Sequence, residues 1–236
     1  MPRMRCIREL IDLVNRKYPD DRFFADIDQK LELPLIADQY QAYERALSGL
    51  DSESWVILKD KAIAHFMDHR EGQMKQGFFN QLNDAFAYRY LVKKGYEQVR
   101  ILREDGKIQP DIKYFDGSEE HFCEIKTIGI SNEVIERRAN FQVTSSLINQ
   151  ELSPGFLNKL RTTLDIAERQ IMARSSKGLI YLLVHFDDFT LDYYDRYRKQ
   201  IVTCLEMHSA EDVYVKIGLI GRKHIKKLRL EARRLG

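Results

Sequence analysis

The chain has 236 residues, of which 44% are hydrophobic and 31% charged, and these values indicate an ordinary soluble globular protein of one large domain, or one domain with a small appendage. The formal net charge of +2 excludes a uniformly basic nucleic-acid binder, and no apolar run approaches the ~20 residues of a membrane helix, so we expect no membrane partner. The three cysteines are scattered, which favours a reducing cytoplasm and supports neither a disulfide framework nor a zinc cluster.

Residues 1–71 are predicted to form a helical N-terminal extension. Apolar residues recur at helical spacing over 6–14, and a second helical pattern covers 35–47. A third helix is predicted to begin near Ser52 or Ser54, either of which could cap it. None of these residues is assigned to catalysis.

Residues 72–236 have the pattern of an α/β domain. The predicted elements are a helix over 73–94, strands over 98–103, 109–115 and 121–128, a helix that Ser153 and Pro154 begin, a strand over 179–185, a helix near 191–207 and a strand near 213–220. The turn sequences Asp105-Gly106 and Asp116-Gly117 separate the first three strands. The apolar run 179–185 is typical of a strand buried on both faces. The predicted fold class is therefore α/β, with a small mixed sheet flanked by helices.

The candidate chemistry lies in Pro110-Asp111 and, on the next predicted strand, Glu124-Ile125-Lys126. Residues two apart in a strand share a face, so Glu124 and Lys126 project together while Ile125 faces the other side, toward the core. The intervening hairpin turn folds the preceding strand back and brings Asp111 near Glu124. Two converging carboxylates are the ligands that Mg²⁺ prefers, and a lysine beside them can orient or deprotonate a water, or neutralise developing charge.

These residues resemble the signature of the PD-(D/E)XK nuclease superfamily, and the order of elements over 73–186 is similar to its restriction-endonuclease-like core. The family often carries an acidic residue on the helix before the first strand. Asp84 stands at that place, where the family residue is usually Glu. The match Pro19-Asp20 with Asp28-Gln29-Lys30 is rejected, because no hairpin turn or strand alternation accompanies it.

The resemblance implies a metal-dependent hydrolase of phosphodiester bonds. Its expected catalytic residues are Asp84, Asp111, Glu124 and Lys126. Its expected ligands to Mg²⁺ or Mn²⁺ are the carboxylates of Asp111 and Glu124 with the backbone carbonyl of Ile125. The family favours DNA over RNA as the substrate, and the absence of a helicase or clamp pattern favours an endonuclease.

Basic residues in three places are candidate contacts to the nucleic-acid backbone. The last sixteen residues carry seven lysines or arginines and one glutamate, which indicates either a solvated helix face or a phosphate-contacting tail. A long polar segment and the start of the following helix supply the others. The candidates are Arg137, Arg138, Lys159, Arg161, Arg222, Lys223, Lys226 and Lys227.

Two other functions stay open at this stage. One is a non-catalytic nucleic-acid-binding module that keeps the nuclease fold, and the other is a protein-interaction module that uses the basic tail and the helical extension. A homodimer is also left open. Metal binding would distinguish the nuclease from both alternatives.

Overall fold

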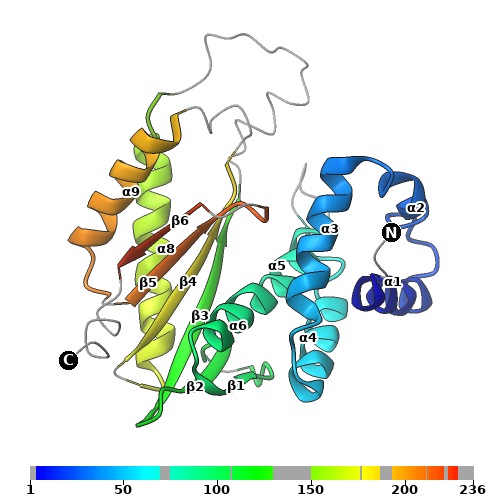
Figure 1. Cartoon of the computed structure of the whole chain (residues 1–236), viewed down its shortest axis with the longest axis horizontal. Helices are drawn as coiled ribbons and strands as arrows, with labels where there is room; N and C mark the ends of the chain where they lie inside the picture. The colour runs from blue at the N-terminus through cyan, green and yellow to red at the C-terminus, as the bar shows by residue number, and fades with distance from the viewer. Residues whose placement is uncertain are drawn as a thin grey trace. The chain divides into compact units, whose positions relative to one another are not determined.

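The computed structural model contains a six-stranded mixed sheet flanked by helices, as the sequence predicts, with strand order β1-β2-β3-β4-β5-β6 (Figure 1). The restriction-endonuclease-like character of this core stays a prediction. The structure describes residues 4–69, 75–106, 108–129, 150–175, 177–186, 193–210, 212–220 and 223–227. The chain divides into two compact units: the first is Met1–Lys107 with Asp111–Glu120, and the second is Ile108–Pro110 with His121–Gly236.

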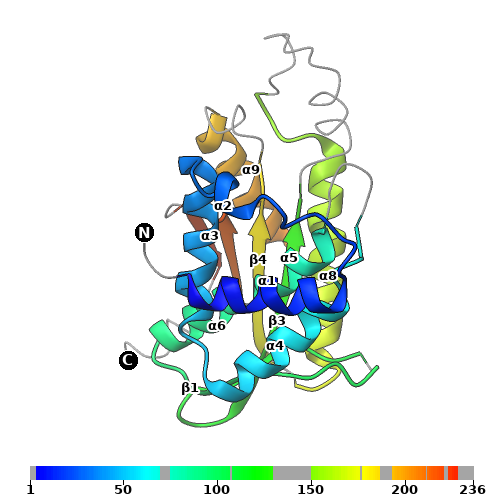
Figure 2. The same ribbon diagram turned by 90° about the vertical axis from the view of Figure 1, so that its right-hand side faces the viewer.

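The first unit is largely helical, in agreement with the helical spacing of its apolar residues. Its helices are α1 (Arg5–Lys17), α2 (Ile27–Lys30), α3 (Pro34–Leu47), α4 (Ser52–Ala64), α5 (Gln76–Leu82) and α6 (Asp84–Lys93). Helix α1 lies across α3 and α4 (Figure 2). The N-cap of α4 is Asp51, whose side chain accepts hydrogen bonds from the backbone of Glu53 and Ser54. The prediction that Ser52 or Ser54 caps this helix is therefore wrong, because a carboxylate one residue earlier satisfies the first amides.

The predicted helix over 73–94 is two helices, which meet at Asn83. Gly95 follows the second one at φ 79°, in the left-handed region where glycine ends a helix, as predicted. Two antiparallel strands complete the unit, β1 (Glu97–Ile101) and β2 (Ile112–Phe115), with Arg100 opposite Lys113.

The second unit contains the remaining strands and two long helices. Its elements are β3 (Glu120–Ile128, of which Glu120 belongs to the first unit), α8 (Pro154–Met172), β4 (Gly178–Val184), α9 (Tyr194–Met207), β5 (Asp212–Ile217) and β6 (His224–Lys227). Strands β3, β4 and β5 run parallel, and β6 pairs antiparallel with β5. The predicted start of α8 is confirmed: Ser153 Oγ accepts a hydrogen bond from the Phe156 amide, and Pro154 is the first helical residue.

The core of the second unit lies between the sheet and helices α8 and α9. Alternate residues of β4, namely Ile180, Leu182 and Val184, belong to this core. The residues between them are also buried, so β4 is covered on both faces, as its continuous apolar run predicts. No helix in the described ranges combines the length and the apolar character needed to cross a bilayer.

Two predicted boundaries differ from the structure. The expected extension over 1–71 does not form a unit of its own, because its helices pack against α5, α6 and β1 and share the first unit with them. One link is the hydrogen bond from the Ile101 amide of β1 to Ser54 Oγ of α4, at 3.1 Å. The expected basic tail begins as the strand β6, which pairs with β5.

Candidate active site

In the first unit, α4 and α6 place two charged side chains in the interior. Lys61 falls at helical spacing within the buried stripe of α4, one turn after Ile57. Asp84 is the first residue of α6, where a carboxylate interacts favourably with the helix dipole. The preceding Asn83 is buried, and its Oδ1 accepts a hydrogen bond from Tyr43 Oη at 3.2 Å. The position of Asp84 is therefore fixed by buried contacts on the adjoining residue.

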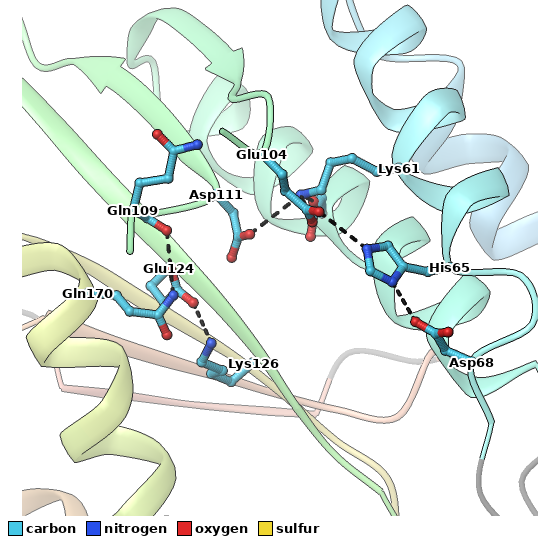
Figure 3. Close-up of polar contacts among 10 residues, drawn as sticks. Lys61, His65, Asp68, Glu104, Gln109, Asp111, Glu124, Lys126 and Gln170 are labelled. Carbon is cyan, nitrogen blue, oxygen red and sulfur yellow. Dashed lines mark hydrogen bonds and ion pairs between the residues drawn. The ribbon is translucent and has the colours of Figure 1, made fainter. Parts of the chain in front are cut away.

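Lys61 is surrounded by three carboxylates, and we name this group the Lys61 cluster (Lys61, Asp84, Glu104 and Asp111). The Lys61 Nζ lies 2.9 Å from Asp84 Oδ2. It lies 3.5 Å from Asp111 Oδ1 (Figure 3). Its distance to Glu104 Oε1 is 3.9 Å. Side-chain exposure rises from 5% for Asp84 to 24% for Asp111 and 55% for Glu104, so the cluster extends from the interior to solvent.

The charges of the Lys61 cluster depend on one another. Burial alone would lower the pKa of Lys61, but the nearby carboxylates of Asp84 and Asp111 outweigh it and raise the pKa above its usual value. Burial raises the pKa of Asp84, and the charge of Asp111 adds to this effect, while Lys61 opposes it. Lys61 is therefore protonated and serves as the counter-ion of its two nearest carboxylates.

His65, one turn after Lys61, extends the cluster toward solvent. Its Nδ1 lies 2.6 Å from Asp68 Oδ2 and its Nε2 lies 3.2 Å from Glu104 Oε2. The hydrogen bond with Asp68 raises the pKa of His65, and Glu104 contributes in the same direction. Glu104 thus contacts both His65 and Lys61, which links the exposed end of the cluster to its buried end.

In the second unit, strand β3 carries the other two expected catalytic residues. Lys126 Nζ lies 2.5 Å from Glu124 Oε1 (Figure 3). The Glu124 side chain is 1% exposed, and that of Lys126 is 27% exposed. The prediction that the two side chains project together is confirmed. A carboxylate this deeply buried is stabilised by the adjacent ammonium, so the pair is a fixed feature of the strand.

The burial of Glu124 corrects the expectation that only the alternate residues of β3 face a core. In the parallel register of β3 and β4, Glu124 lies beside Ile180 and Lys126 beside Leu182, and both of these partners belong to the core under α8 and α9. Ile125 is buried as well, as predicted. Both faces of β3 are therefore covered at Glu124, and of the Glu124-Ile125-Lys126 motif only Lys126 reaches partly to solvent.

A shared metal ion for Asp111 and Glu124 stays a prediction, because Asp111 belongs to the first unit and Glu124 to the second. Within the described ranges, no group of three or more His, Cys, Asp or Glu side chains is arranged to hold a metal ion. The donor chemistry nevertheless fits Mg²⁺, which is usually held by one or two carboxylates and keeps several of its waters. The role expected for the carbonyl of Ile125 stays a prediction too.

The candidate nucleic-acid contacts separate into four groups. Lys159, Arg161 and Lys226 are exposed, as a phosphate contact requires. Lys223 places its Nζ 4.4 Å from the centre of the Tyr194 ring. Lys227 donates hydrogen bonds to the carbonyl oxygens of Leu205 and His208. Its ammonium thus stabilises the C-terminal end of α9, and the nucleic-acid role expected for it stays a prediction. Arg137, Arg138 and Arg222 lie outside the described residues.

Comparison with known proteins does not assign the chain to a family. No protein-family model matches it, and neither the curated proteins nor the solved structures gave a match. The interpretation of the site therefore depends on its own residues and on the motif that they form.

Sequence reasoning overlooked Lys61, His65 and Glu104. Lys61 lies in a segment to which no catalytic role was assigned. The sequence nevertheless indicates that this lysine is buried. Residues 54, 57, 58, 61 and 62 form the buried stripe of α4, and a lysine in such a stripe needs a buried counter-charge. That requirement would have pointed to an acidic partner from another element.

Proposed function

We propose that the chain is a metal-dependent nuclease that hydrolyses phosphodiester bonds, with Mg²⁺ or Mn²⁺ as its cofactor. The observation that carries the proposal is the pair on β3, in which Lys126 lies 2.5 Å from the buried carboxylate of Glu124. The buried carboxylate of this pair can serve as a ligand to a cation. The partly exposed lysine, two residues further along the same strand, places a positive charge beside that ligand. The motif that begins at Asp111 also supports a metal-dependent nuclease.

The proposed roles follow from the chemistry of each group. Asp111 and Glu124, with the carbonyl of Ile125, would hold the divalent cation. A bound cation would polarise the phosphate and make a coordinated water more acidic. Lys126 would position the attacking water, accept its proton or stabilise the charge that grows on the phosphate oxygens. Water oxygen then bonds to phosphorus, the phosphorus–oxygen bond to the leaving sugar breaks, and that oxygen takes a proton.

The preference for DNA and for internal cleavage comes from the family resemblance. Exposed basic residues such as Lys159, Arg161 and Lys226 could neutralise backbone phosphates of either nucleic acid. Both DNA and RNA are therefore tested as substrates.

The test is incubation of purified protein with supercoiled, linear and branched DNA and with RNA, in Mg²⁺, in Mn²⁺ and in a chelator. We expect metal-dependent nicking of supercoiled DNA by the wild type and by Lys113→Met. Lys113 is a matched control, because it is a strand lysine in an exposed ion pair with Glu120. Lys126→Met should lose the activity. Equal cleavage by all three proteins would contradict the proposal.

One observation favours a second candidate, a non-catalytic module that keeps the arrangement. Lys61 already neutralises Asp84 and Asp111, so these carboxylates have a structural use without any metal. In that case the protein binds nucleic acid or another protein and cleaves nothing. A mobility-shift assay that shows DNA binding, with no cleavage at any metal concentration, would support this second function.

A further inference from the structure

The Lys61 cluster has the charge pattern of a cation site, and a cation of the chain itself fills it. The ammonium of Lys61 lies between Asp84 and Asp111, at 2.9 Å and 3.5 Å from their nearest oxygens. Only 5% of the Lys61 side chain is exposed. An ammonium group at these distances takes the place between the carboxylates that a metal ion would need.

Electrostatics explains why a cation stabilises this position. Two ionised carboxylates in a poorly solvated place repel each other, and each loses hydration free energy on burial. A nearby positive charge offsets both effects. Helix α4 provides that charge in a fixed position, because its N-cap at Asp51 and its buried stripe hold the helix in the first unit. The ammonium is therefore a permanent part of the fold.

We propose that Lys61 is an internal counter-cation that excludes a divalent ion from the position between Asp84 and Asp111. In two-metal sites, including those of nucleases, two divalent ions lie about 3.5–4 Å apart and stabilise both the attacking and the leaving oxygens. In this chain the ammonium of Lys61 takes the position of a second ion, beside the Asp111 carboxylate of the proposed active site. The inference rests on the proposed function only in assigning Asp111 to that site.

In this proposal Asp84 is a positioning residue, because it holds the ammonium of Lys61 in place. Its carboxylate is the nearest oxygen to the ammonium, and it holds Lys61 in reach of Asp111. This assignment differs from the catalytic role that the family resemblance implies for Asp84. It also predicts that Asp84 becomes available to metal only after Lys61 is removed.

The test counts bound ions by calorimetry with Mn²⁺ in four full-length proteins: wild type, Lys61→Met, the double variant Lys61→Met/Asp84→Asn, and Lys59→Met. Lys59 is the matched control, since it lies on the same helix and forms an ion pair with Glu9. We expect Lys61→Met to bind one more ion per chain than wild type. The double variant and Lys59→Met should each bind the same number as wild type.

Lys61→Met could fail to fold without metal. Circular dichroism, recorded without and with Mn²⁺, therefore measures whether the variant is folded in each condition. Folding that Mn²⁺ restores supports the proposal, because the divalent ion then replaces the ammonium. A folded Lys61→Met that binds no additional ion overturns it, and so does a variant that stays unfolded at saturating Mn²⁺.

Ion counting separates this inference from the proposed function. If the gain of one ion is observed but no protein cleaves nucleic acid, the nuclease proposal fails and the counter-cation stands. If the wild type is an active nuclease but Lys61→Met gains no ion, the counter-cation fails and the nuclease stands.

Discussion

Lys61 and Asp84 form a buried ion pair in which the ammonium nitrogen lies 2.9 Å from the carboxylate oxygen and both side chains are 5% exposed. Removing one partner of such a pair leaves a buried charge and is strongly destabilising. We expect Lys61→Met to lower the free energy of unfolding in metal-free buffer by about 3–5 kcal/mol. Urea unfolding followed by circular dichroism measures this change.

The double variant Lys61→Met/Asp84→Leu should recover a large part of the lost stability, because it removes both charges and replaces them with apolar groups. Lys59→Met, which breaks a more exposed ion pair with Glu9, should change stability by less than about 1 kcal/mol. If Lys61→Met and Lys59→Met have equal effects, the buried pair has no special energetic role.

A second prediction concerns metal binding by Asp111. Its side chain is 24% exposed, so part of it is accessible to a divalent cation. We expect Asp111→Ala to abolish the Mg²⁺ or Mn²⁺ binding that calorimetry detects in the wild type. Asp60→Ala is the matched control, since Asp60 is an exposed acid that pairs with Arg103. Unchanged binding in Asp111→Ala would remove Asp111 from the metal site.

A third prediction distinguishes two neighbouring lysines of β6. Lys226 is exposed, whereas Lys227 donates to carbonyl oxygens at the end of α9. We expect Lys226→Gln to weaken DNA binding and to reduce the salt slope by about one, because one fewer counterion is released. Lys227→Gln should instead lower stability and leave the salt slope unchanged. An unchanged salt slope in both variants, in titrations at several salt concentrations, would exclude β6 from the DNA contact.

A fourth prediction concerns acid stability. Burial, together with the charge of Lys216, lowers the pKa of His185 to about 4. Since the unfolded chain takes up this proton near pH 6.5, the contribution of neutral His185 is fully present above that pH and is lost as pH falls toward 4. The loss is at most about 3 kcal/mol. His185→Gln should flatten the fall in stability between these pH values.

The sequence predicted those parts of the fold in which local signals and tertiary contacts agree. Ser153-Pro154 begins α8 as expected, and the apolar run of β4 is a strand buried on both faces. The break at Asn83 was missed, because the apolar pattern continues through it and only the buried contact with Tyr43 marks the place. Strand β6 has a single buried residue, Ile225, and depends on pairing with β5, which local sequence cannot reveal.

The candidate site was predictable to a smaller extent. The pairing of Glu124 with Lys126 follows from strand periodicity and is confirmed. The burial of Glu124 was not predictable, since it depends on the register with β4 and on the core under α8. Lys61 reaches Asp84 and Asp111 from a helix far away in sequence, and only the folded chain shows which acids meet it.

The last prediction separates catalysis from folding at Lys126. This ammonium contacts a carboxylate that is 1% exposed, so Lys126→Ala should lower the free energy of unfolding by roughly 1–3 kcal/mol. Cleavage should fall by about two orders of magnitude or more, the usual loss when a proton acceptor or charge partner is removed. The double variant Lys126→Ala/Glu124→Gln should regain stability, because the buried charge is gone, but it should stay inactive. A plasmid-nicking time course and urea unfolding, with Lys113→Ala as the control, measure both effects. Recovery of cleavage together with stability in the double variant would show that Lys126 only supports the fold.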